Sequence, residues 1–163
     1  MAVALSPMGL RAVQAANPSN GQMKMTILGS ALALTSPQAL NFGAVLAGGV
    51  VGTVKIDTAG VRTWTAVTPL ATPLPSEAIM KAFGNSGLSI DVSVTKTAFT
   101  VANTTAATMV VDQFNINTNA GGTKQTLFLT GTTRLIPIGA TLHVGSPQAV
   151  GTYKGTFTVT VAY

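Results

Sequence analysis

The stretch GTYKGTFTVTVAY, residues 151–163, carries the strongest structural signal in the chain. Its odd-numbered positions are mostly apolar or aromatic, and its even-numbered positions from 154 to 160 carry lysine or threonine. Because successive side chains of a strand point to opposite faces, this alternation predicts one β-strand with an apolar and a hydroxyl-rich face. At roughly 3.3 Å per residue it would span about 40 Å, the height of a small sandwich. A long uncovered edge invites further pairing, so we expect something to cover it.

The composition is that of a globular chain with few charges. Of the 163 residues, 47% are hydrophobic and 8% are charged, where about a quarter is usual for charged residues. One domain with a core of its own is therefore expected, and its sparsely charged surface suggests burial in an assembly or a secreted life. The formal net charge is +5, but the cations stand singly without interleaved aromatics, so no nucleic-acid partner is expected.

Residues 1–16, MAVALSPMGLRAVQAA, are mostly small or apolar. They end in Val13-Gln14-Ala15, which puts small side chains at the positions that a signal peptidase reads. Two interpretations stay open: a signal-peptide remnant, or an N-terminal arm that is kept. No other run approaches the roughly 20 apolar residues that a transmembrane helix needs.

Residues 17–28 begin with turn and linker chemistry, NPSNG, and continue as an alternating segment. Its apolar positions are Met23, Met25 and Ile27. After Gly29 the apolar set slips by one position, to Leu32 and Leu34, which exchanges the two faces of a strand. Either one strand bends at a glycine bulge here, or two strands with different partners meet.

Short apolar or alternating runs predict further strands along the rest of the chain. They cover residues 52–57, 61–67, 77–83, 88–94, 98–101, 109–116, 126–130 and 136–144. Val111 and Phe114 are expected in the core. Closely spaced strands with no convincing helical period predict an all-β, two-layer antiparallel sandwich.

Residues for catalysis or metal binding are scarce. His143 is the only histidine and falls in an expected strand, where we expect a solvent-facing or packed side chain and not a metal ligand or catalytic base. No cysteine is present, so a zinc site of ordinary type is not expected. The carboxylates are widely separated in sequence and do not indicate a catalytic pair; they are Asp57, Glu77, Asp91 and Asp112. We therefore expect no enzyme, no cofactor and no small-molecule substrate.

Several motifs occur in an order typical of one protein family. They are LNFG at 40–43, AGG at 47–49, GTVKID at 52–57, GATL at 139–142 and GTYKGTF at 151–157. With Met109, Val111 and Phe114 between them, the chain from about residue 23 onward resembles a pilin-like domain family of unknown function from Gram-negative bacteria. Members are similar to the immunoglobulin-like subunits of fimbriae and other surface filaments.

The resemblance implies an incomplete sandwich over residues 29–163, completed by an extended strand from a neighbouring subunit. Residues 17–28 would be the donor strand, inserting Met23, Met25 and Ile27. The acceptor groove would lie beside the terminal strand, lined by Phe157, Val159, Val161 and Tyr163. Such a contact need not close and can propagate into a filament.

The partners implied are identical subunits, and further a periplasmic chaperone and outer-membrane export machinery. The location implied is the bacterial cell surface or an extracellular filament, reached through the periplasm. Two alternatives remain: the same arm packs on its own domain as a first strand, or the chain is a secreted binding module that does not polymerise. A binding module would be expected to display clustered exposed aromatics.

Overall fold

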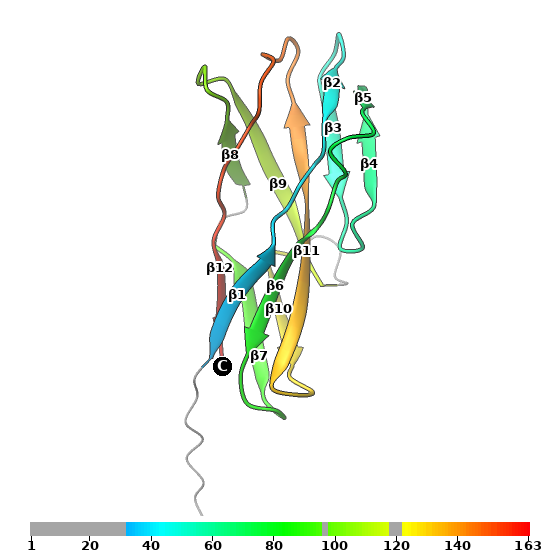
Figure 1. Cartoon of the computed structure of the whole chain (residues 1–163). Coiled ribbons are helices and arrows are strands. Elements are labelled where there is room, and N and C mark those ends of the chain that lie inside the picture. Colours follow the sequence, from blue (N-terminus) through cyan, green and yellow to red (C-terminus); the bar gives the residue numbers. More distant parts are fainter. Residues whose placement is uncertain (1–31, 96–97, 118–121) are drawn as a thin grey trace, which may run out of the picture.

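The computed structural model describes residues 32–95, 98–117 and 122–163, and every regular element among them is a β-strand. In chain order these are β1 (Ala33–Gln38), β2 (Val45–Ala47), β3 (Gly52–Ile56), β4 (Arg62–Thr65), β5 (Val67–Pro69), β6 (Ala78–Phe83), β7 (Ser89–Val94), β8 (Ala98–Ala102), β9 (Thr108–Ile116), β10 (Lys124–Phe128), β11 (Thr133–Val144) and β12 (Val159–Ala162). The strands follow the long axis of an elongated molecule (Figure 1). Within the described part of the chain, no helix is long and apolar enough to cross a membrane.

The strands form an all-β antiparallel sandwich, as the alternating patterns predicted. One sheet has the order β1-β6-β11-β3-β4, with β9 and β8 added beside β11, and the facing sheet has the order β10-β7-β12. β11 is the longest strand and links both ends of the larger sheet. Its first half pairs with β6, and its second half pairs with β3 and β9. A short β2–β5 ladder stands apart from both sheets.

The core lies between the two sheets and is built from alternate residues of their strands. Ile90, Val92 and Val94 of β7 are buried, and their polar neighbours face outward. β11 buries Ile136, Ile138, Ala140, Leu142 and Val144. These are the side chains that period-two alternation places on one face, because a strand can bury one face and leave the other in water.

β9 changes phase at Gln113, so that Val111 and Phe114 are both buried. Unbroken alternation would put them on opposite faces. Gln113 has a φ of 49°, and the pairing with β11 shifts register between Gly139 and Thr141. This β-bulge turns both halves of β9 toward the core, and the expectation that Val111 and Phe114 are core residues is confirmed.

The strand expected over residues 61–67 is in fact two strands. β4 ends at Thr65, and Ala66, with a φ of 53°, turns the chain into β5. A residue in the left-handed region interrupts a regular ladder, and after Ala66 the chain pairs with β2 instead of β3. Trp64 therefore belongs to a short edge strand and is 48% exposed.

The single strand expected over residues 151–163 is wrong in its extent. Only β12 forms a ladder, while Lys154 makes an isolated bridge with Ala102 of β8. The alternation itself is present, since Tyr153, Phe157 and Val159 pack against the core and the intervening threonines are exposed. Tyr153 and Phe157 thus pack on the core although neither β7 nor β8 forms a ladder with this part of the backbone.

Candidate functional site: an apolar groove between two sheet edges

A groove of about 1250 Å³ opens between the beginning and the end of the described chain. β1 is the last strand of the larger sheet on this side, and β12 is the last strand of the smaller one. They lie along the same side of the sandwich (Figure 1). Within the described chain β1 pairs only with β6, and β12 only with β7, so each strand has one free edge.

The floor of the groove is the hydrophobic core itself. Its residues come from three strands of the larger sheet: Ala78 and Met80 of β6, Met109, Val111 and Phe114 of β9, and Leu142 and Val144 of β11. The Phe114 ring also packs against Phe157, with 5.3 Å between the ring centroids. An occupant of the groove would therefore add apolar contacts to the core.

The N-terminal wall, residues 39–47, is held in place by polar contacts to the backbone. Asn41 and Ser76 exchange two backbone hydrogen bonds of 2.8 Å, and the Asn41 side chain accepts a bond from the Gly43 amide at 2.9 Å. Gly43 has a φ of 75°, which glycine adopts without steric cost. The Arg62 guanidinium donates to the Leu70 carbonyl at 2.9 Å and to the Phe42 carbonyl at 3.4 Å. The LNFG motif thus builds a wall of the groove.

The C-terminal wall is shaped by a glutamine and a tyrosine. The Gln148 amide donates to the Tyr153 hydroxyl at 2.7 Å, and that hydroxyl donates to the Ala149 carbonyl at 2.6 Å. The Gln148 side-chain oxygen accepts a bond from the Gly145 amide at 3.0 Å. These bonds hold residues 145–153 in a compact turn, so the chain enters the wall in a defined direction.

The backbone of the C-terminal wall is oriented for further pairing. Lys154 exchanges two hydrogen bonds with Ala102, at 2.9 and 3.0 Å, and the Thr158 carbonyl accepts from the Thr95 amide at 3.0 Å. Backbone groups of successive residues in a strand point to opposite edges. The amide and carbonyl of Val159 in β12 therefore point to the groove edge, and a further strand could pair there and beside the Lys154 bridge.

One end of the groove is closed by side chains around Gly84. A Cβ at Gly84 would lie 2.7 Å from the Tyr163 hydroxyl and 3.3 Å from Leu32. The same hydroxyl accepts a hydrogen bond from the Asn85 amide at 3.0 Å. The end of β12 and the approach to β1 thus meet here, at what we call the arm-exit end. The opposite end, the mouth, lies between residues 44–47 and 148–152.

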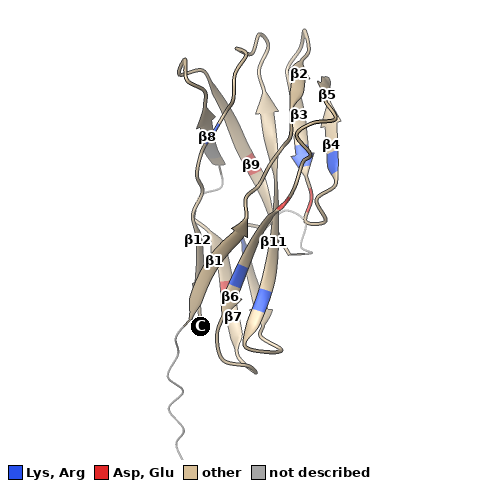
Figure 2. Cartoon of the chain, viewed as in Figure 1, with Lys and Arg blue, Asp and Glu red and all other residues tan. Residues whose placement is uncertain are grey.

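The groove resembles a strand-binding site more than a small-molecule site. Its volume exceeds the range of about 300–1,000 Å³ that is usual for small ligands. Of the described residues that line it, Lys154 alone is charged. Figure 2 shows the charges of the described chain around the middle of the molecule.

Only two of the four expected acceptor residues line the groove. Phe157 and Val159 line the groove. Val161 packs against the core beyond the described lining, and Tyr163 belongs to the closed end. The expected donor residues Met23, Met25 and Ile27 lie outside the described residues. Residues 39–47 also line the groove; strand alternation does not indicate this wall, although the LNFG motif marks its position.

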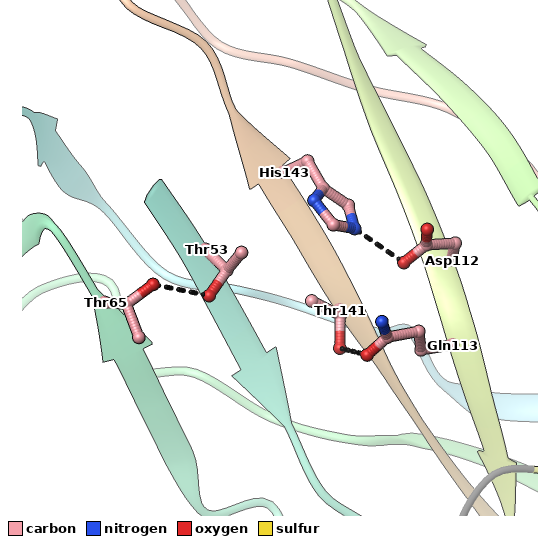
Figure 3. Close-up of polar contacts among 6 residues, drawn as sticks. All are labelled: Thr53, Thr65, Asp112, Gln113, Thr141 and His143. Atoms are coloured by element: carbon pink, nitrogen blue, oxygen red, sulfur yellow. Dashed lines mark hydrogen bonds and ion pairs between the residues drawn. The ribbon is translucent and has the colours of Figure 1, made fainter. Parts of the chain in front are cut away.

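Apart from the groove, a polar cluster lies on the outer face of the larger sheet (Figure 3). His143 of β11 contacts Asp112 of β9, with 2.7 Å between Nε2 and Oδ1. Thr141 donates to Gln113 at 3.2 Å, and Thr53 and Thr65 share a 2.8 Å hydrogen bond. The histidine and aspartate side chains are 37% and 30% exposed. Such a half-exposed pair across two strands is a modest contribution to stability.

No metal centre is found within the described ranges, because no three His, Asp, Glu or Cys side chains gather there. Asp57 instead accepts two backbone hydrogen bonds of the β3–β4 turn, from Ala59 at 2.9 Å and from Val61 at 2.8 Å. The apolar groove is therefore the principal candidate site.

Comparison with known proteins gives one match. The family profile described as "Domain of unknown function (DUF4402)" matches residues 32–163. No curated protein matches the chain, and no solved structure matches it. The match begins next to β1 and extends through β12, so it includes both walls of the groove.

Proposed function

The chain belongs to the family described as Domain of unknown function (DUF4402), and we propose that it is a structural subunit of an extracellular filament. In this proposal each copy inserts its N-terminal arm, residues 17–28, into the groove of the next copy. The single observation that carries the proposal is the apolar groove between the free edges of β1 and β12.

The groove offers what an extended, alternating strand requires. Its floor is apolar, and the backbone groups of its C-terminal wall point to the open edge. A strand laid between the two edges could pair with the wall while turning one of its faces to the floor, which is β-strand addition. Met23, Met25 and Ile27 share one face of such a strand.

The contact could be strong without any chemical step. Each apolar side chain that becomes fully buried contributes about 1.5–3 kcal/mol. Met23, Met25 and Ile27 together offset part of the cost of association and of ordering the arm. Backbone hydrogen bonds along the wall add to this, so we expect a peptide of the arm to bind with a Kd of about 1 µM or lower.

The closed end gives the inserted arm a direction. A donated arm must leave the groove to join its own domain at Leu32, and the arm-exit end is occupied by Tyr163 and Leu32 of the acceptor. The donor would therefore leave through the mouth. It would run antiparallel to residues 151–163, with Met23 deep in the groove and Ile27 nearer the mouth.

The pilin-like resemblance of the motifs supports a filament subunit exported through the periplasm to the bacterial cell surface. Identical subunits are the partners that the proposal requires, and a periplasmic chaperone and outer-membrane machinery would serve export. The alternative of a monomeric binding module has less support. The exposed aromatics Trp64 and Phe128 lie on β4 and β10, and Tyr163 lies beyond β12.

Substitution in the arm of the full chain tests this function. We expect the unmodified protein to form concentration-dependent multimers and filaments, visible by sedimentation and negative-stain microscopy. Met25→Asp should abolish them, because a carboxylate cannot enter an apolar groove without a large desolvation penalty. A labelled peptide of residues 20–30 should bind the monomeric Met25→Asp protein.

Lys24→Ala is the matched control, because residue 24 lies on the opposite face of the arm strand. This variant should assemble like the unmodified protein. If the unmodified protein stays monomeric at all concentrations and the Met25→Asp protein does not bind the peptide, the chain is either the binding module or has its arm folded onto its own domain. Equal assembly of the Met25→Asp and unmodified proteins would also contradict the proposal.

A further inference from the structure

Exposed aliphatic side chains gather at the mouth of the groove. Leu46 is 57% exposed, Val50 63%, Val51 66% and Val150 99%. We call these residues the apolar tip. Leu46 and Val150 line opposite walls of the groove mouth, and Val50 and Val51 continue from β2 toward β3. The tip is therefore continuous with the candidate site.

The loops that form this end carry no charged side chain. They comprise residues 44–52, 65–70, 103–108 and 144–152. The loops of the arm-exit end, residues 84–89 and 129–133, also contain no charged residue. Phe128 at the end of β10 is 52% exposed there, and its carbonyl accepts a hydrogen bond from the Arg134 guanidinium at 2.6 Å, so this end is poor in charge but carries one cation at its edge. Figure 2 shows the charged residues between these two ends. Depletion of charge is the compositional mark of an interface core, whereas solvated surfaces retain charges.

We propose that the apolar tip docks on the arm-exit end of a second copy of this chain. The inference rests on the proposed function, because the inserted arm brings the two ends together. Between Ile27 in the groove and Leu32 of its own domain the chain can span at most about 17 Å. If Ile27 lies near the mouth, the arm-exit end of the donor must lie close to the acceptor's tip.

Arm insertion and end contact then act together in a head-to-tail assembly. The arm supplies the linkage, and contact between the tip and the next domain excludes water around the point where the arm enters. The sides of the molecule, which carry the charges, remain in solvent. This arrangement joins the uncharged tip to the charge-poor arm-exit end and leaves none of the tip residues in water.

The test places charges on the tip and measures insertion and assembly separately. The variant is Val50→Lys with Val51→Lys, in the full chain, because neither of these tip residues lines the groove. Both side chains are exposed, so the fold should be retained, which thermal unfolding checks. The matched control is Val61→Lys with Val110→Lys, whose side chains are 55% and 43% exposed and lie outside the loops of both ends. The readouts are the critical concentration for assembly and the affinity of the arm peptide in a Met25→Asp background.

We expect the tip variant to raise the critical concentration about tenfold or more, because buried apolar contacts are replaced by charges. The control should stay within about twofold, as for substitutions outside an interface. Peptide affinity should be unchanged in both. A tip variant that binds the peptide and assembles like the control would overturn this inference and leave the proposed function standing. Absence of peptide binding in the parent chain would overturn both.

A lipid surface is the other occupant that an uncharged tip would suit. Tip-dependent binding to phosphatidylcholine vesicles, with assembly equal to that of the control, would overturn the inference in favour of a membrane contact.

Discussion

Gly139 lies where β11 has neighbours on both sides, and no side chain fits at this position. A Cβ there would overlap the Ile56 carbonyl oxygen and lie 2.8 Å from the Asp57 carbonyl carbon. Both obstacles are backbone atoms, which cannot rotate away as the end of a long side chain can. The GATL motif thus begins with a glycine because β3 approaches β11 closely at this point.

Gly139→Ala should therefore lower the free energy of unfolding by about 1–3 kcal/mol, as overpacking of a filled interior does. Urea denaturation of the monomeric Met25→Asp protein would measure it. Gly131→Ala is the control, because nothing lies within 4 Å of a Cβ at Gly131, and it should change stability by less than about 0.5 kcal/mol. Equal effects of the two substitutions would contradict the role assigned to Gly139.

At the level of elements, the C-terminal segment shows why a long alternating pattern need not form one long strand. The alternation over residues 151–163 correctly indicated the side chains that pack on the core, because alternation depends only on local backbone geometry. Its hydrogen-bonded partners, Ala102 of β8 and Thr95 next to β7, come from distant parts of the chain. No local pattern could show that they would meet the segment at separate points. The open edge on the other side, and hence the groove, follows from that topology.

The direction of the inserted arm can be read by cysteine pairs, because the chain has no cysteine of its own. If the arm enters through the mouth, Met23→Cys with Val159→Cys should form disulfides between copies and give a ladder of multimers on non-reducing gels. Ile27→Cys with Val159→Cys should not, because residues 23 and 27 lie about 13 Å apart along a strand and a disulfide needs Cβ atoms about 4 Å apart.

An arm folded back into its own groove would reverse this result. It would join residue 27 to residue 159 within one copy and leave a cross-linked monomer. The two arrangements therefore differ in which pair reacts and in whether the product is a multimer.

At the level of the whole molecule, the distribution of charge sets how assembly responds to salt. The proposed contacts are apolar and backbone contacts, with Lys154 alone among charged residues in the described lining. Copies of a chain with a formal net charge of +5 repel one another. Salt screens that repulsion and does not weaken burial of apolar surface.

Raising sodium chloride from about 0.05 to 0.5 M should thus leave the critical concentration unchanged or lower it, and sulfate should lower it further. Light scattering or sedimentation at a series of protein concentrations measures this. A critical concentration that rises steeply with salt would indicate that ion pairs hold the assembly, which contradicts an apolar junction.

Local patterns in the chain were sufficient to identify strands such as β7 and β11, their buried faces and the sandwich class. The direction in which a side chain points depends on its immediate neighbours in the chain, so such information is present in any short segment. The bulge at Gln113, the split of β4 from β5 at Ala66, and the groove between β1 and β12 arise from pairing between distant segments. Those features depend on which edges remain free once every other strand has found a partner, and a free edge is a property of the assembled sheets.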